Sequence, residues 1–102
     1  MELNVVDMSF DNLLMSLANG EFDMVIAGIT SDEERKKAVD FSDPYLLSKS
    51  LILVREEDAD KYQTLDDLVG AKGGAQTGSI QYELAQENTP DANIIGLAKV
   101  TD

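Results

Sequence analysis

Apolar and polar residues in the first third of the chain follow two different periods. Four apolar side chains recur at the three- and four-residue spacing of an amphipathic helix: Phe10, Leu13, Leu14 and Leu17. Ser9 is the expected N-cap of this helix, and Asn19-Gly20 is its expected stop. Residues 22–27 (FDMVIA) are almost continuously apolar, which is typical of a strand buried on both faces of a parallel sheet. With a short strand in residues 2–6, the pattern predicts a β-α-β unit.

The middle of the chain predicts one short helix and one strand. Residues 31–37 are polar, and Ser31 or Asp32 is the expected cap of a helix with acidic residues in its first turn. Asp43-Pro44 marks a turn. Residues 50–54 (SLILV) have the composition of a strand, and a charged loop follows them.

Residues 64–100 predict a second alternation of helices and strands. Thr64 caps one or two helical turns that end at Gly70, and Ser79 opens a longer helix. Strands are expected at residues 72–76, where two glycines weaken the prediction, and at 93–100. The whole order predicts an α/β fold with two mostly parallel sheets flanked by helices.

Composition excludes several functional classes. The 102 residues carry a net charge of −12, which disfavours binding to nucleic acids or anionic lipid surfaces. The chain has no cysteine and no histidine, so thiolate chemistry and the commonest metal ligand and general base are absent, and no cofactor is expected. No apolar run is long enough to span a membrane and no export signal precedes the fold, so a signal in an exported parent protein would lie upstream of Met1.

Two places have the character of a ligand site, because open α/β sheets bind ligands beyond the carboxyl ends of their strands. In the first, Gly28 and Thr30 lead to Arg35, whose planar fork matches a carboxylate. In the second, residues 76–80 (QTGSI) place a glycine turn before a helix start, where free N–H groups attract anions. Taken singly, Arg35 also fits a solvated helix residue, and Gly78-Ser79 also fits an ordinary turn and cap.

Residues 27–30 (AGIT), the pair Glu34-Arg35 and residues 38–45 (AVDFSDPY) together form a pattern of high specificity. They resemble the signature of the type II periplasmic-binding-protein fold, in the family 3-like extracellular solute-binding proteins that take polar amino acids. Residues 65–70 (LDDLVG) and the later Gln76, Gly78 and Ser79 resemble the opening of that family's second lobe. The resemblance covers nearly the whole chain.

For the first lobe, the resemblance implies contacts with the common part of an amino acid. The backbone at Gly28 and the hydroxyl of Thr30 would meet the α-ammonium and α-carboxylate groups. Arg35 would form a bidentate pair with the same carboxylate.

For the second lobe, the resemblance implies that Ser79 and the backbone N–H of Ile80 also meet the carboxylate. Gln76 lies where some family members contact the ligand side chain, which points to a polar amino acid. The two lobes would close over the ligand and exclude water.

The resemblance also implies a domain division and an incomplete fold. Residues 1–50 belong to lobe 1, residues 51–63 to a crossover or hinge region, and residues 64–102 to lobe 2. Family members are much longer, so we interpret the chain as an interior part of such a protein, without the first strand of lobe 1 and the acid that pairs with the ammonium. We therefore expect weak or no ligand binding by the chain itself, and folding assisted by a second copy or by exchange of elements between copies.

Two residues depart from the family pattern. Asp32 stands where the family has Thr; it preserves the helix cap but adds a negative charge near the carboxylate site. Gly73 stands where the family has Val or Ile, and glycine in a strand costs about 0.5–1 kcal/mol in backbone entropy, besides the lost burial.

The expected function is that of a receptor that delivers a polar amino acid to the permease subunits of an ABC importer, without catalysis. The resemblance implies a periplasmic or extracellular, membrane-anchored lipoprotein as the parent. Two alternatives stay open: an enzyme of the same fold, similar to arogenate or prephenate dehydratase, and a ligand-sensing domain of a signalling protein. The enzyme would need an acid catalyst, for which the nearby candidates are Asp32, Glu33 and Glu34.

Overall fold

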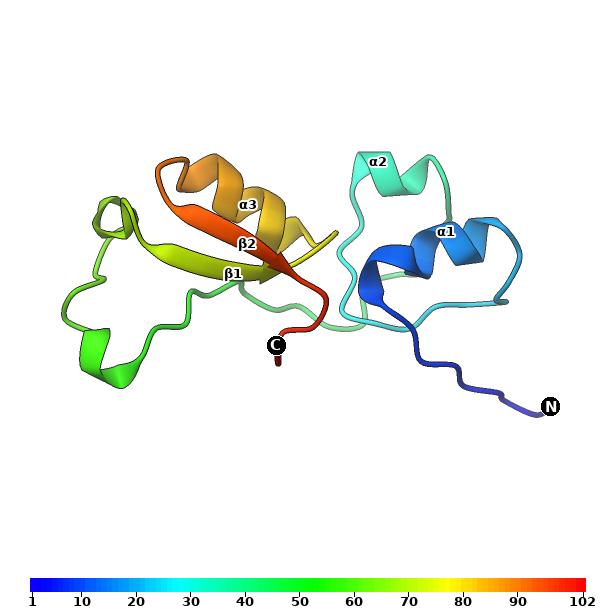
Figure 1. Cartoon of the computed structure of the whole chain (residues 1–102). Helices are drawn as coiled ribbons and strands as arrows, with labels where there is room; N and C mark the ends of the chain where they lie inside the picture. The colour runs from blue at the N-terminus through cyan, green and yellow to red at the C-terminus, as the bar shows by residue number, and fades with distance from the viewer.

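Two groups of elements lie side by side in the computed structural model, which describes residues 1–102 and measures 52 × 26 × 23 Å (Figure 1). The first group contains α1 (Leu13–Ala18), which a short 3-10 helix precedes, and α2 (Glu33–Lys36). The second contains β1 (Lys72–Gln76), α3 (Ile80–Asn88) and β2 (Asn93–Leu97). The three 3-10 helices are Phe10–Asn12, Glu56–Asp58 and Leu65–Leu68.

The second group is a parallel β-α-β unit. β1 pairs with β2 in register from Lys72 opposite Asn93 to Gln76 opposite Leu97, and α3 forms the crossover between them. This confirms the α/β class, the strand at 72–76 and the helix that Ser79 opens. The last strand is shorter than predicted: it ends at Leu97, because the chain then turns and Lys99 N–H donates to the Asp102 carboxylate at 3.0 Å.

The two glycines of β1 make room for large side chains of β2. A Cβ added at Gly73 would lie 2.9 Å from Cδ1 of Ile94, and one at Gly74 would lie 3.0 Å from Cδ1 of Leu97. The space that a β1 side chain would fill is therefore occupied from β2, so the glycines are compatible with the strand that they seemed to weaken.

The two predicted helices of the first group are present. The 3-10 helix Phe10–Asn12 continues into α1, and Gly20, with φ of +79°, follows its last turn. Ser9 caps it without a side-chain bond to the backbone; its hydroxyl accepts a hydrogen bond from the Asn12 amide at 2.8 Å. α2 begins at the predicted cap, where the Asp32 carboxylate accepts the backbone N–H of Arg35 at 2.8 Å.

Three strand predictions are wrong. Residues 2–6, 22–27 and 50–54 run without strand pairing, so the first group forms no sheet of its own. The physical reason is that a strand exists only where a neighbour satisfies its backbone N–H and C=O groups, and no backbone ladder joins these segments to one another or to β1 and β2. Their apolar composition is typical of strands, but the backbone pairing that a strand requires is not formed by these residues.

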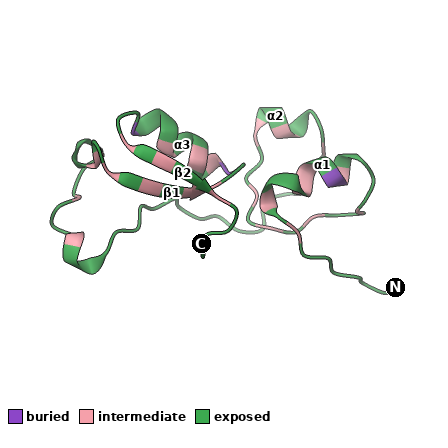
Figure 2. Cartoon of the chain, in the orientation of Figure 1, coloured by how far each residue is buried: buried purple, intermediate pink, exposed green.

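Burial is correspondingly slight. No apolar side chain is fully buried, and the buried residues are Ser16, Ser79 and Thr89 (Figure 2). Leu51, Ile52 and Leu53 are exposed along one wall of an open groove that β1 and α3 also line. The elements are thus held chiefly by local hydrogen bonds and caps, and none of the helices has the length and apolar character needed to cross a bilayer.

One group of these local hydrogen bonds forms a capping box at the start of the 3-10 helix Leu65–Leu68. The Asp67 carboxylate accepts the backbone N–H groups of Thr64 and Gln63, each at 2.9 Å. The hydrogen bond from Thr64, followed by that from Gln63, lowers the pKa of Asp67 below its ordinary value of 3.8, because both bonds favour the ionised form.

Replacing Asp67 by Asn should therefore remove a stabilisation that depends on pH. Since the pKa in the folded state is lowered, the carboxylate stabilises the fold above its ordinary pKa, and that contribution is lost as the pH falls through the lowered value. Urea unfolding at about pH 7 and about pH 2.5 measures the effect, and the loss caused by Asp67→Asn should be larger at the higher pH. Asp66→Asn is the control, because the Asp66 carboxylate accepts no hydrogen bond; equal losses in both variants would contradict the assignment.

Candidate functional site

Arg35 joins the two groups of elements. From α2 its guanidinium donates through Nη1 to the carbonyl oxygen of Thr30 at 2.6 Å, and through Nη2 to that of Gly78 at 2.9 Å. Thr30 lies just before α2, whereas Gly78 lies just before α3. The Arg35 side chain is only 13 % exposed. It is therefore not a solvated helix residue, which was the alternative interpretation of its sequence context.

The guanidinium retains donors for a ligand. It has five N–H bonds, of which two go to the carbonyls of Thr30 and Gly78, and the Nε–H lies beside the Asp32 carboxylate at 3.5 Å. One N–H on each Nη nitrogen is left. Carboxylates are the usual partners of such guanidinium donors.

The turn before α3 brings the second group against the first. Gly78 has φ of +78°, and a Cβ there would lie 3.2 Å from both Cα and Cβ of Asp11. Only glycine combines this left-handed backbone with so close an approach. Gly78 therefore places the start of α3 beside the start of the first helix and presents its carbonyl to Arg35.

Ser79 and Ile80 lie at the N-terminus of α3. Ser79 is 4 % exposed; its hydroxyl donates to the Gln76 carbonyl at 2.7 Å and accepts the Tyr82 N–H at 3.2 Å. This hydroxyl is thus already engaged as the helix cap. Ile80 is the first residue of α3, so its N–H has no partner within the helix and lies at the positive end of the helix dipole.

The remaining predicted residues are placed differently. Gly28 is exposed, and a Cβ there would find nothing within 4 Å. The Thr30 hydroxyl is exposed and free, since only its carbonyl is engaged. The side-chain amide of Gln76 donates to the Ala98 carbonyl at 3.2 Å, beyond the end of β2, and so is not directed at Arg35. The structure thus brings together Thr30, Arg35 and residues 78–80.

Two contacts at this site were not predicted. Asp11 packs against Gly78, and the Tyr45 hydroxyl donates to the Ala27 carbonyl at 3.1 Å, next to Gly28. The glycine of a turn was the one sequence signal for the first contact, but it does not reveal which distant residue approaches. For the second contact the local pattern contains no signal.

Chemically, the arrangement offers hydrogen-bond donors and positive charge rather than metal ligands. A partly buried guanidinium and a helix N-terminus both bind anions, and carboxylates in particular. The structure contains no cluster of three or more acidic residues that could hold a metal ion.

A parallel β-α-β unit and a second helical group that meet at an arginine fork define the class: an α/β solute-binding protein of the type II periplasmic fold. The model of the bacterial extracellular solute-binding proteins, family 3, matches residues 1–96. The chain belongs to that family.

Relatives with a known role support this assignment. The arginine-binding extracellular protein ArtP of Bacillus subtilis is 40 % identical over 90 residues, which is 88 % of this chain and 34 % of ArtP. AbpA of Streptococcus pneumoniae, an amino-acid ABC transporter substrate-binding protein solved with L-arginine bound, superposes with a TM-score of 0.93 at 39 % identity, over 98 % of this chain and 42 % of that chain. An ancestral amino-acid-binding protein, described as a precursor of cyclohexadienyl dehydratase, gives 0.89 at 37 % identity, over 94 % and 43 %. The chain thus spans less than half the length of each.

The contact between Gly78 and Asp11 can be tested by comparing two glycines of similar backbone conformation. Gly78→Ala should destabilise the chain by about 1–2 kcal/mol for the left-handed φ, with a further loss from the contact with Asp11. Gly70→Ala is the matched control, since Gly70 has φ of +74° but open space around it. Urea unfolding of both variants measures the difference, and a loss at Gly78 no larger than at Gly70 would show that the close approach contributes nothing.

Proposed function

We propose that this chain forms the carboxylate-binding part of a receptor for a polar amino acid, which delivers its ligand to an ABC importer without catalysis. The observation that carries the proposal is the bridge of Arg35 to Thr30 and Gly78, one in each group of elements. A ligand carboxylate on the remaining Nη donors would sit between the two groups and be held from both sides.

The surrounding donors support this assignment. The Ile80 N–H at the start of α3 and the free Thr30 hydroxyl would complete the shell around the carboxylate, and the open space at Gly28 would admit the ammonium group. Ser79 would act mainly by capping α3 and so keeping the helix N-terminus in place. Gln76 would contact a ligand side chain only after releasing the carbonyl of Ala98.

The same site suggests how the receptor works. Residues 1–50 and 64–102 would be parts of two lobes, with residues 51–63 as the crossover or hinge between them. Closure of the lobes would exclude water and strengthen the pair between Arg35 and the carboxylate. We infer that the parent protein is an extracellular or periplasmic membrane-anchored receptor whose partners are permease subunits.

The choice of first ligand follows from the relatives. ArtP is named as arginine-binding, and AbpA was solved with L-arginine. The net charge of −12 also attracts a cationic ligand at long range. L-Arginine is therefore the first candidate, with histidine and glutamine as further polar ligands.

The enzyme alternative has less support in the site. Asp32 is held by the main chain and side chain of Arg35, Glu33 pairs with Lys36, and Glu34 pairs with Lys37. Each of these three acids thus has a basic partner, and Glu33 and Glu34 are largely exposed to solvent. A sensor domain would use the same clamp, and the binding test below applies to it equally.

Binding should appear as ligand-dependent thermal stability. At about 10 mM L-arginine, a dissociation constant of about 1 mM would stabilise the folded chain by about 1.4 kcal/mol. Arg35→Ala should abolish the shift, and Arg35→Lys should reduce it strongly, because lysine keeps the charge but loses the planar fork. Differential scanning calorimetry with each of the twenty amino acids measures it.

D-Arginine and arginine methyl ester serve as ligand controls for that experiment, since the first changes the geometry at Cα and the second removes the carboxylate charge. A shift of the same size with the methyl ester would mean that Arg35 does not bind the carboxylate. No shift with any amino acid would mean that this chain alone does not form the receptor site.

The unpaired apolar segments lead to a separate expectation about assembly. Residues 22–27 and 50–54 have strand composition without a strand partner, and such segments pair readily between chains. We infer that the isolated chain forms homo-oligomers, by strand pairing or by exchange of elements between copies. Size-exclusion chromatography with light scattering should show a dimer or larger species, whereas a monomer with a sharp unfolding transition would contradict this.

A further inference from the structure

The Asp32 carboxylate contacts both the main chain and the side chain of Arg35. One carboxylate oxygen accepts the backbone N–H of Arg35 at 2.8 Å, and the other lies 3.5 Å from Nε of the same residue. The first contact caps α2, as expected of an aspartate at this position. The second is not needed for capping, and it brings a negative charge against the guanidinium that bridges the two groups of elements.

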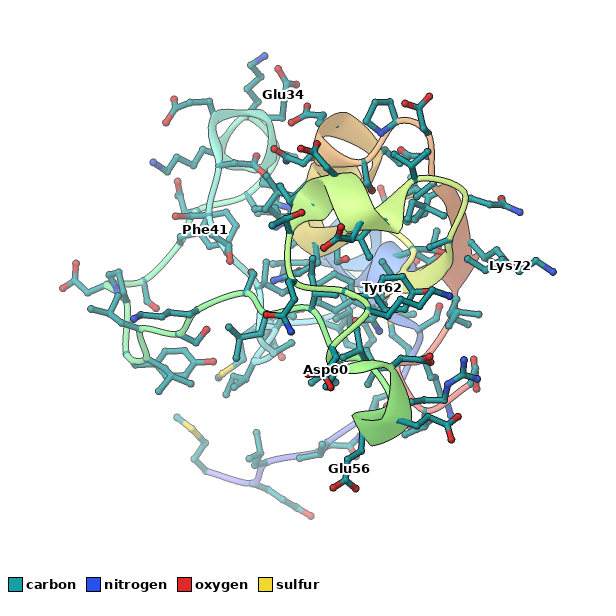
Figure 3. All side chains as sticks on the ribbon, turned by 90° about the vertical axis from the view of Figure 1, so that its left-hand side faces the viewer. Glu34, Phe41, Glu56, Asp60, Tyr62 and Lys72 are labelled. Atoms are coloured by element: carbon teal, nitrogen blue, oxygen red, sulfur yellow. The ribbon has the colours of Figure 1, made fainter.

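The other ion pairs of α2 differ from this one in their surroundings. Glu33 with Lys36 and Glu34 with Lys37 have the same three-residue spacing, but their side chains are largely exposed. Glu34 is 83 % exposed and lies at the outer edge of the molecule (Figure 3). By contrast, Asp32 is 35 % exposed and Arg35 is 13 % exposed, so solvent screens their attraction less.

The guanidinium is hydrogen-bonded at two of its nitrogens and lies beside a carboxylate at the third. Nη1 donates to the Thr30 carbonyl and Nη2 to the Gly78 carbonyl, while Nε lies 3.5 Å from the Asp32 carboxylate as an ion pair. The two carbonyls are neutral, so Asp32 is the group that balances the charge of Arg35. A ligand with one carboxylate and one ammonium brings no net charge to this balanced pair. A second carboxylate on the ligand would leave the site with one excess negative charge, and removing the charge of Asp32 would offset it.

We propose that Asp32 is a positioning residue for Arg35, and that its charge makes the site select against amino acids with an acidic side chain. The second part rests on the proposed function. The first part concerns the protein without ligand and stands independently of it.

The selectivity is tested with a matched pair of variants and a matched pair of ligands. Asp32→Asn keeps the shape and the capping ability of the side chain but removes its charge. Glu34→Gln removes the same charge from an exposed pair of the same helix with the same spacing. L-Glutamate and L-glutamine have nearly the same size and differ in the side-chain charge, so the ratio of their affinities isolates the electrostatic effect.

Isothermal titration calorimetry at low salt should show that Asp32→Asn raises the affinity for glutamate relative to glutamine by about five- to tenfold. Glu34→Gln should change that ratio by less than about twofold. Equal changes in the two variants would overturn the selectivity, because they would report only the net charge of the chain. Asp32→Ser, a second uncharged N-cap, replaces the Asn variant if that variant is unfolded.

The positioning is tested without any ligand, by the NMR signal of the Arg35 Nε–H group, which Arg35→Lys identifies by its disappearance. Because the Arg35 side chain is 13 % exposed and its Nε lies beside the Asp32 carboxylate, this proton should exchange slowly with water in the unsubstituted chain. Asp32→Asn should accelerate the exchange by about tenfold, while Glu34→Gln leaves it unchanged. Unchanged exchange in Asp32→Asn would overturn the positioning role. If no amino acid binds the unsubstituted chain, the proposed function and the selectivity both fail, while this signal still decides whether Asp32 positions Arg35.

Discussion

The bridge of Arg35 to the carbonyls of Thr30 and Gly78 is the contact on which the candidate site depends. α2, from which it extends, has four residues, and so short a helix is unstable by itself. The Asp32 carboxylate stabilises α2 by accepting the Arg35 N–H, and the same carboxylate lies beside the guanidinium. The Asp32 carboxylate therefore supports both the helical backbone of α2 and the position of the Arg35 side chain.

That dependence on local contacts follows from the slight burial of the chain. Folding orders every residue at a cost in conformational entropy, and burial of apolar surface is the usual compensation. No apolar side chain here is fully buried, so hydrogen bonds at helix starts carry an unusual share of the stability. Both parts of the site stand on such starts: Asp32 caps α2, and Ser79 caps α3. The site is thus built at two helix starts that are capped by neighbouring side chains.

The sequence predicted the elements whose signals are local and failed for those that need distant partners. Asp32, Thr64 and Ser79 mark helix starts correctly, because a cap acts on residues two or three positions away. The apolar runs at 22–27 and 50–54 describe strands that require a neighbour to supply hydrogen bonds, and composition does not reveal whether one is available. In the site, the pattern identified the two stretches around Arg35 and Ser79, but not the approach of Asp11 to Gly78 that brings them together.

The donor arrangement of Arg35 also explains how a site at so open a surface could bind a small ligand. A free arginine side chain loses much rotational freedom when it binds a carboxylate, which weakens binding. Here part of that loss has already occurred, because two hydrogen bonds and the neighbouring Asp32 carboxylate order the guanidinium in the absence of ligand. The contact with Gly78 exists only while the second group lies against the first, so whatever separates the groups also frees the arginine. Ligand binding and closure would therefore be coupled through this one side chain, since each favours the same position of the guanidinium.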